Sequence, residues 1–213
     1  MPRNHKTIAI LGGSFDPPHI GHIDMAESVL SKNMADEVWL TPCGDVHSFG
    51  KSMSPATDRL KMCRLLATDK IKVHDDDIKG DFKGRTFWLM WHLKETYPNH
   101  TFWFIIGADN AARFREWYQY KKLLTEAHFI IFPRGDYEID PVFKKGLVHR
   151  TGFSLTDRNI IMTMSPPAPI SSTLVRELLR LGQMWWPKET GKLLSEFLDG
   201  KVLEYIKKKR LYQ

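Results

Sequence analysis

Short apolar runs alternate along the chain with longer segments in which apolar residues recur every three or four positions. In the runs IAIL, FWFII and FIIF nearly every position is apolar, which is typical of strands that are covered on both faces. We therefore expect strands at Lys6–Leu11, Glu37–Pro42, Ile71–His74, Thr101–Ile106, His128–Phe132 and Ile160–Met164.

Segments with helical spacing lie between these strands. They predict helices at Ile20–Lys32, Ala56–Ala67, Thr86–Tyr97 and about Ala111–Leu124. The alternation of strand and helix indicates an α/β fold, with a Rossmann-like parallel sheet and helices on both of its faces. Because ligands of such sheets bind at the carboxyl ends of the strands, the residues after Leu11 and after Ile106 are candidates for a site.

The last third of the chain departs from this alternation. The polar segment at 133–156 predicts an irregular excursion, and the prolines at 166–169 exclude a helix interior. Residues 171–173, Ser-Ser-Thr, are favourable for a helix start and predict a helix over Leu174–Leu181 that Gly182 ends. A length of 213 residues suits one domain, residues 1–213, with a helical C-terminal part over about 171–213.

Composition narrows the class of protein. Hydrophobic residues make up 42% and charged residues 26% of the chain, as in ordinary globular proteins. There is no apolar run of about 18 residues, so we expect no membrane span. Two cysteines without a C-x-x-C pattern argue against a disulfide framework or a cysteine zinc site. The first residues contain no apolar signal-peptide core, so we expect a cytoplasmic protein.

The formal net charge of +6 fits an anionic partner, either a nucleotide or a nucleic acid. The densest basic run, Lys207–Arg210, contains no interleaved aromatic residue. This favours a solvated helix end over a nucleic-acid patch, and we expect no nucleic-acid partner. The sequence leaves the oligomeric state open, a homo-oligomer included.

The most informative segment is GGSFDPPHIGH at 12–22, between an expected strand and an expected helix. Gly12 and Gly13 permit a positive φ and a close backbone approach. A glycine turn before a helix N-terminus is typical of a phosphate site. His19 and His22, three residues apart, can face one side and donate hydrogen bonds to phosphate oxygens. The segment therefore predicts chemistry on a phosphate.

Two further segments add to this site. Ile170-Ser171-Ser172-Thr173 predicts an anion site at a helix start with Arg176 one turn on, although the same residues suit a plain helix cap with a surface arginine. Gly107-Ala108-Asp109-Asn110 follows an expected strand, where Asp109 can hold a ribose hydroxyl or cap a helix.

Other residues are less specific. Trp117-Tyr118-Gln119-Tyr120 suits either the core or stacking on a heteroaromatic ring, whereas Trp88 and Trp91 favour the core. Lys51 is equally a phosphate ligand or a solvated loop residue. Asp75–Asp77 favours a solvated acidic turn over a metal site. No dedicated metal cage is visible in the sequence, and Mg²⁺ would arrive with a nucleotide.

Together these segments resemble those of the nicotinate/nicotinamide mononucleotide adenylyltransferases, within the HxGH-type nucleotidyltransferase superfamily. GGSFDPPHIGH resembles the first signature, ISSTLVR the second, GADN with WYQYKKLL the middle block, and Val202–Tyr212 the C-terminal helix. The resemblance covers nearly the whole chain. It implies a nucleotidyltransferase fold. It also implies an enzyme that uses ATP with Mg²⁺ and transfers AMP to a pyridine mononucleotide. The products are the dinucleotide and pyrophosphate, in NAD biosynthesis.

The resemblance also implies residue roles. His19, His22 and Arg176 are expected to be catalytic, with the histidines on the ATP phosphates and Arg176 on the triphosphate end. The expected ATP-binding residues are Gly12, Gly13, Ser14, Phe15, Gly107, Asp109, Ser171, Ser172 and Thr173. The expected mononucleotide-binding residues are Ser14, Phe15, Lys51, Thr86, Trp117 and Tyr118.

Alternatives stay open at this point. The loop PCGDVHSFGKSMSP resembles eukaryotic members and WYQY bacterial ones, so the sequence does not choose between the acid and the amide mononucleotide. A phosphopantetheine or cytidylyl transferase is the nearest other enzyme. A class I aminoacyl-tRNA synthetase shares HIGH at 19–22, but its KMSKS loop would come much later than KSMS at 51–54. A non-catalytic nucleotide- or RNA-binding module is the remaining class, and the intact histidines and Arg176 argue against it.

Overall fold

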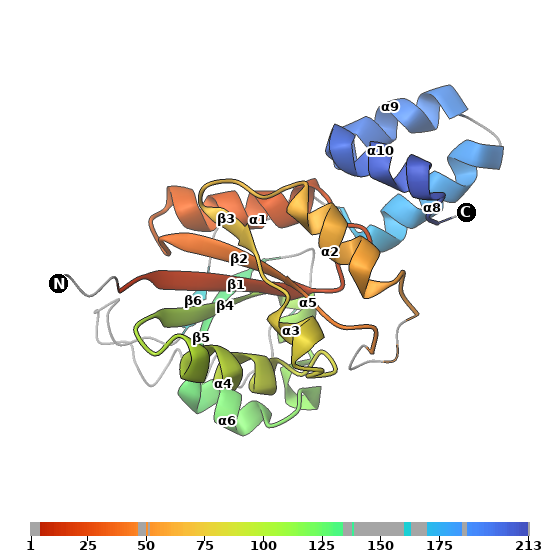
Figure 1. Ribbon diagram of the computed structural model, residues 1–213. Coiled ribbons are helices and arrows are strands. Elements are labelled where there is room, and N and C mark those ends of the chain that lie inside the picture. The colour runs from red at the N-terminus through yellow and green to blue at the C-terminus, as the bar shows by residue number, and fades with distance from the viewer. Residues whose placement is uncertain are drawn as a thin grey trace.

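Six strands form one parallel sheet in the part of the chain that the structure describes, in the order β3-β2-β1-β4-β5-β6 (Figure 1). This computed structural model describes residues 5–46, 50, 52–133, 138, 160–162, 170–184 and 187–212. The strands are β1 (Thr7–Gly13), β2 (Glu37–Pro42), β3 (Ile71–Val73), β4 (Thr101–Gly107), β5 (His128–Phe132) and β6 (Ile160–Met162). The predicted fold class and all six predicted strands are confirmed, with ends that agree to within two residues.

Helices cover both faces of the sheet because successive strand residues point to opposite sides. Ile8 and Ile10 of β1 pack toward α4 (Thr86–Thr96) and α6 (Tyr120–Glu126). Ala9 and Leu11 pack toward α1 (Ile20–Ser31) and α2 (Ala56–Arg64). The remaining short helices are α3 (Asp76–Lys79), α5 (Ala108–Ala111) and the 3₁₀ helix η1 (Phe114–Glu116).

The strand order reverses at the centre of the sheet. From β1 the chain moves outward through β2 to β3, and then returns to the other side of β1 to form β4. In such sheets the crevice at the carboxyl ends of the two central strands is the usual ligand position. This topology places the segment after β1 beside the segment after β4.

Gly12 and Gly13 belong to β1, and neither adopts the positive φ that a glycine permits. A Cβ atom on Gly12 would lie 2.7 Å from Cζ of Phe104 on β4, so the glycine provides space for that ring. The positive φ of this segment, 49°, falls on Phe15 instead.

The helix expected at Ala111–Leu124 is wrong, because three short elements replace it. Trp117 is extended (φ −73°, ψ 140°) and Gln119 is left-handed (φ 55°), which separates η1 from α6. Phe114 is buried and the ring of Trp117 packs edge-on against Phe104 at 6.0 Å between centroids. Packing of these aromatic rings on the core therefore overrides continuous helical spacing.

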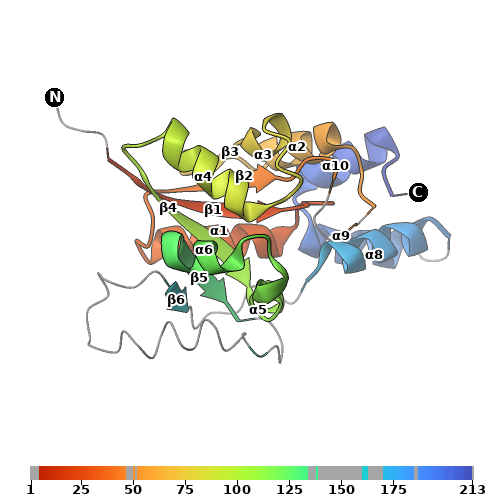
Figure 2. The same ribbon diagram turned by 90° about the horizontal axis from the view of Figure 1, so that it is seen from below.

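Three further helices lie at one end of the sheet, beyond the carboxyl ends of the central strands and opposite the start of β1 (Figures 1 and 2). They are α8 (Ser172–Met184), α9 (Pro187–Phe197) and α10 (Gly200–Lys209). They pack on one another and, through Met62, on α2. None of the helices in the described ranges is long and apolar enough to cross a membrane.

Gly182 does not end the helix that was predicted before it, because α8 continues to Met184. A Cβ atom on Gly182 would lie 2.9 Å from Cγ2 of Thr190 on α9, so the glycine allows the two helices to approach closely. Most of the expected excursion at 133–156, the prolines at 166–169 and the pair Trp185-Trp186 lie outside the described residues.

The two glycines of this helix pair give a matched test. We expect Gly182→Ala to lower the free energy of unfolding by about 1 kcal/mol or more, because Thr190 must move. Gly191→Ala, in α9 with open space around its Cβ position, should raise it by about 0.5–1 kcal/mol through helix propensity. Urea unfolding of both variants checks this. Equal stabilisation by both would contradict the close approach at Gly182.

Candidate active site

A cavity of about 970 Å³ opens at the carboxyl ends of β1 and β4. Its walls come from β1, the loop before α1, and the starts of α4, α5 and α8. The predicted site residues that line it are Gly12, Gly13, Ser14, His19, His22, Thr86, Gly107, Asp109, Trp117, Tyr118, Ser171, Ser172, Thr173 and Arg176. The fold therefore gathers segments that are far apart in the sequence around one space.

Two predicted residues are not among the lining residues. The side chain of Phe15 is 1% exposed, and its ring lies 4.7 Å from that of His22, so it supports the histidine instead of lining the floor. Lys51 lies outside the described residues.

His19 and His22 stand at the start of α1. His19 is the residue that precedes the helix, and its backbone N–H donates to Nδ1 of His22 at 3.2 Å. Because Nδ1 accepts this bond, the neutral ring of His22 has its proton on Nε2. The two imidazoles lie 3.8 Å apart between centroids. The geometry therefore gives His22 an Nε2–H group that can donate to a phosphate oxygen.

The start of α8 is bound to the loop that follows β1. The hydroxyl of Ser172 donates to the carbonyl oxygen of Pro17 at 2.9 Å. Nη1 of Arg176 donates to the carbonyl oxygen of Asp16 at 2.6 Å, and Nη2 donates to Oγ1 of Thr173 at 3.2 Å. These two contacts leave three of the five guanidinium N–H groups for other acceptors. The second sequence motif is thus fixed directly to the first.

Ser171 and Gly21 complete this junction. Oγ of Ser171 accepts the backbone N–H of Leu174 at 3.2 Å, so Ser171 is the cap of α8. A Cβ atom on Gly21 would lie 3.0 Å from Cγ2 of Ile170 and 3.2 Å from the ring of His19. The absence of a side chain at Gly21 lets the segment before α8 pack beside the histidine.

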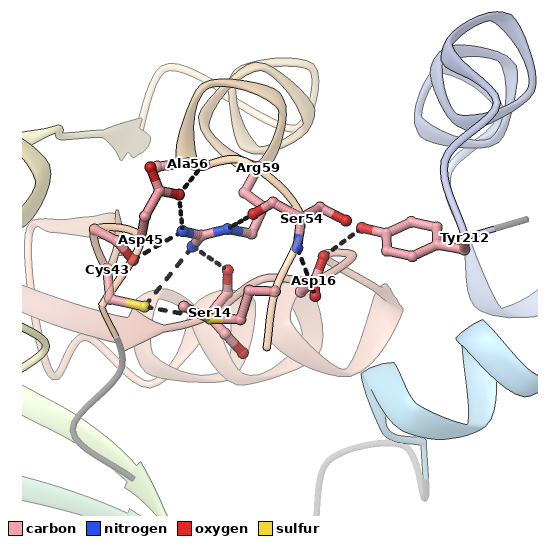
Figure 3. A network of polar contacts seen from close by, with 10 residues as sticks. Ser14, Asp16, Cys43, Asp45, Ser54, Ala56, Arg59 and Tyr212 are labelled. Atoms are coloured by element: carbon pink, nitrogen blue, oxygen red, sulfur yellow. Dashed lines mark hydrogen bonds and ion pairs between the residues drawn. The ribbon is translucent and has the colours of Figure 1, made fainter. Parts of the chain in front are cut away.

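Arg59 was missed by the sequence reasoning and holds the loops under the cavity (Figure 3). Its side chain is fully buried. Nε donates to the carbonyl oxygen of Ser54 at 2.7 Å, Nη1 to that of Ser14 at 2.8 Å and Nη2 to that of Gly44 at 2.9 Å. One guanidinium therefore ties the loop after β1 to the loop after β2.

A signal for Arg59 does exist in the sequence. Arg59, Met62 and Cys63 have the i, i+3, i+4 spacing of one helix face, and all three are buried. A charged residue on an apolar face needs buried partners, which here are carbonyl oxygens of loops that precede the helix.

Asp16 connects the same loops to the end of the described chain (Figure 3). Its Oδ2 accepts the backbone N–H of Ser54 at 3.2 Å, and its Oδ1 accepts the hydroxyl of Tyr212 at 2.7 Å. Burial, together with the negative charge of Asp16, raises the pKa of Tyr212. The phenol therefore stays protonated and donates to the carboxylate.

Aromatic residues form the wall of the cavity near α4. Trp117 lies between core and cavity, and its indole N–H is buried without a hydrogen-bond partner among the described residues. Tyr118 is 40% exposed and lies at the rim, where its ring neighbours Trp88 at 5.9 Å. Trp91 was expected in the core, but 54% of it is exposed because it lies on the outer face of α4.

The acidic segment before and within α3 is not the solvated turn that was expected. Asp75 pairs with Lys79 at 2.9 Å, whereas Asp77 is 4% exposed and lies in the cavity wall. Burial raises the pKa of Asp77 to about 6, although a hydrogen bond from the backbone of Gly84 opposes this. Within the described ranges, no group of three acidic, histidine or cysteine side chains could hold a metal ion.

The buried guanidinium predicts a large stability difference between two arginines of α2. Arg59→Met leaves three carbonyl oxygens without their donor and should cost roughly 3 kcal/mol or more. Arg64→Met removes a half-exposed side chain and should change the free energy of unfolding by about 0.5 kcal/mol or less. Urea denaturation measures both, and similar costs for the two variants would refute the role of Arg59.

The raised pKa of Asp77 predicts that replacing its carboxyl with an amide, in Asp77→Asn, increases the free energy of unfolding by an amount that depends on pH. The folded-state pKa of about 6 lies above the ordinary aspartate value of 3.8, so wild-type stability falls as the pH rises from about 4 to 6. Asp77→Asn avoids this loss. We expect its advantage to be near zero at pH 4 and to reach about 3 kcal/mol above pH 6. The exposed Asp69→Asn is the control. Thermal unfolding across this range is the measurement, and a pH-independent difference would count against it.

Comparison with known proteins places the chain in a family. The family model described as cytidylyltransferase-like matches residues 10–178. A relative from Anaeromyxobacter sp. (strain K) with the name "Probable nicotinate-nucleotide adenylyltransferase" is 33% identical, and the alignment covers 98% of this chain and 97% of the relative. A protein of the same name from Oceanobacillus iheyensis is 30% identical, with 97% of each chain covered.

A solved structure agrees with these relatives. The Plasmodium falciparum nicotinic acid mononucleotide adenylyltransferase, complexed with NaAD, superposes with a TM-score of 0.74 at 26% identity, covering 98% of each chain. The same enzyme complexed with APC gives the same values. With this fold, this cavity and these full-length relatives, the chain belongs to the cytidylyltransferase-like family and, within it, to the nicotinate-nucleotide adenylyltransferases, a group of nucleotidyltransferase enzymes.

Proposed function

We propose that the cavity binds ATP and nicotinate mononucleotide and joins them into the dinucleotide, with release of pyrophosphate. The observation that carries this proposal is the junction of Arg176 and Ser172 with the backbone of residues 16 and 17. It brings the start of α8 to the cavity wall that also contains both histidines. A cluster of cationic and N–H donors suits a triphosphate.

The reaction is a single displacement at phosphorus. An oxygen of the mononucleotide 5′-phosphate forms a bond to the α-phosphorus of ATP. The bond from that phosphorus to the oxygen bridging the α- and β-phosphates breaks, and its electron pair leaves with pyrophosphate. No side chain has to form a covalent intermediate, so positioning and electrostatic stabilisation supply the catalysis.

The cavity residues take their roles from this reaction. Negative charge grows on the oxygens around the α-phosphorus and on the leaving oxygen, where His19, the Nε2–H of His22 and the remaining N–H groups of Arg176 stabilise it. Ser171, Ser172 and Thr173 bring the N-terminus of α8 to the triphosphate. Because the proton of the Ser172 hydroxyl is donated to Pro17, the backbone is the better donor there.

The other cavity residues divide between the two nucleosides. Gly107 and Asp109 lie against the ATP ribose, and Gly12, Gly13 and Ser14 form the floor of the site, with Phe15 behind His22. Thr86, Trp117 and Tyr118 hold the pyridine ring, which suits the flat aromatic surface that they offer. The assignment of Lys51 to the mononucleotide phosphate stays a prediction.

Mg²⁺ enters this proposal as the counter-ion of ATP. The donor set fits that role, because the histidines and Arg176 are positioned for anions and no described group of three ligands forms a metal cage. Phosphate oxygens and water would supply most of the coordination, as is usual for this ion. The cytoplasmic location and the absence of a nucleic-acid partner stay predictions.

The acid form of the mononucleotide is the proposed acceptor because the curated relatives are named for nicotinate. The test is to incubate the protein with ATP, Mg²⁺ and either mononucleotide, and to measure pyrophosphate and dinucleotide. We expect turnover with a higher kcat/KM for nicotinate mononucleotide. Turnover with neither would refute the proposed reaction, and a preference for the amide would refute the acceptor.

His22→Ala tests the catalytic role of the imidazole. We expect kcat to fall about 100-fold or more, while the affinity for ATP changes much less, because the Nε2–H stabilises charge that grows only in the transition state. His5→Ala, at the opposite end of β1, is the matched control and should leave kcat unchanged. Steady-state kinetics and ATP titration measure both, and equal losses in kcat and affinity would sink the assignment.

A further inference from the structure

Arg85 is a cation in the cavity wall that the sequence motifs do not include. It is the residue that precedes α4, and it lines the cavity together with Thr86 and Tyr118. Its guanidinium carbon lies 4.8 Å from the centre of the Tyr118 ring, which is within the range of a cation–π contact. The charge is therefore placed beside the aromatic residues proposed for the pyridine.

The backbone of Arg85 and the ring of Tyr118 that its guanidinium contacts are both held in place. The N–H of Arg85 donates to the carbonyl oxygen of Phe82 at 3.0 Å, and its own carbonyl accepts the N–H groups of Trp88 and Leu89. The ring of Tyr118 packs against Phe87 at 6.0 Å and against Trp88 at 5.9 Å. The guanidinium thus rests on a supported ring, so binding a ligand there orders little additional structure.

Within the described ranges, the guanidinium of Arg85 has no ion pair and no hydrogen bond. Of the acidic residues in the cavity wall, Glu116 is bonded to Nε of Arg113 at 3.1 Å, and Asp16 is bonded to Tyr212 and Ser54. Asp77 is buried, and its carboxyl group accepts a hydrogen bond from the backbone of Gly84. Neither these three carboxylates nor that of Asp109, the fourth acidic residue of the cavity wall, forms an ion pair with Arg85.

We propose that Arg85 selects the acid form of the pyridine mononucleotide by binding the carboxylate of the nicotinate ring. This inference rests on the proposed function, since it assigns the pyridine to the wall that contains Thr86, Trp117 and Tyr118. A guanidinium has five N–H donors and no acceptor. It can bond both oxygens of a carboxylate, whereas a carboxamide offers one oxygen and directs an NH₂ group at the same donors.

The test compares both acceptors on one variant, Arg85→Gln. We expect its kcat/KM for nicotinate mononucleotide to fall about 10- to 100-fold, since a charge-assisted pair is lost. For nicotinamide mononucleotide, kcat/KM should change less than about threefold. Quenching of tryptophan fluorescence by each mononucleotide without ATP gives Kd values that should follow the same pattern.

Arg115→Gln is the matched control. Arg115 is exposed in η1 and is not among the cavity-lining residues, so its loss removes one surface charge without removing the proposed contact. We expect it to leave the ratio of the two kcat/KM values unchanged. Arg85→Lys should recover only part of the preference, because an ammonium group does not offer two parallel N–H bonds.

Each outcome decides the proposal. Equal losses for both acceptors in Arg85→Gln would overturn it and assign Arg85 to the phosphate or ribose that the two share. An unchanged ratio in Arg85→Gln, or an equal change in Arg115→Gln, would also overturn it. These results are distinct from a failure of the proposed function, which would appear as a wild-type protein that converts neither acceptor.

Discussion

The loop that follows β1 contains backbone carbonyl oxygens that accept no hydrogen bond within a strand or helix, and it depends on side-chain donors for them. Carbonyl oxygens in extended or irregular segments need donors when they are buried. Here Arg59 donates to Ser14, Arg176 to Asp16 and Ser172 to Pro17. The donors come from α2 and α8, which are distant from the loop in sequence. The position of the histidines therefore depends on the side chains of Arg59 and Ser172, which contact no phosphate in the proposed reaction. It also depends on Arg176, which does contact the triphosphate in that proposal.

In the proposed reaction Arg176 has both a structural and a catalytic role. Two of its N–H groups hold the protein together, and the other three remain for the triphosphate. Binding of ATP would then add contacts to a side chain that is already oriented, so little reorganisation is needed, as expected of a preorganised site. Arg59, by contrast, is fully buried and is not among the cavity-lining residues, so its contribution is to position the loops.

The sequence predicted the fold class, the six strands and a set of site residues most of which line the cavity, because strand periodicity and the two signatures are local patterns. It failed where tertiary contacts decide local geometry. Gly12 and Gly182 give space to Phe104 and Thr190, which only the packed structure brings near. The helix expected across Trp117 is interrupted because its aromatic side chains turn into the core. Arg85 carried no signal, since an arginine before a helix is ordinary.

The bond between Asp16 and Tyr212 spans 196 positions of the chain. A ribosome that adds about 5 to 20 residues per second needs roughly 10 to 40 s to travel from one partner to the other. During that time the loop that follows β1 is already synthesised, but the hydroxyl of Tyr212 that donates to the carboxylate of Asp16 is still missing. A nascent chain that has formed its sheet therefore does not yet have this contact, because the carboxylate of Asp16 gains this donor only after Tyr212 has been synthesised.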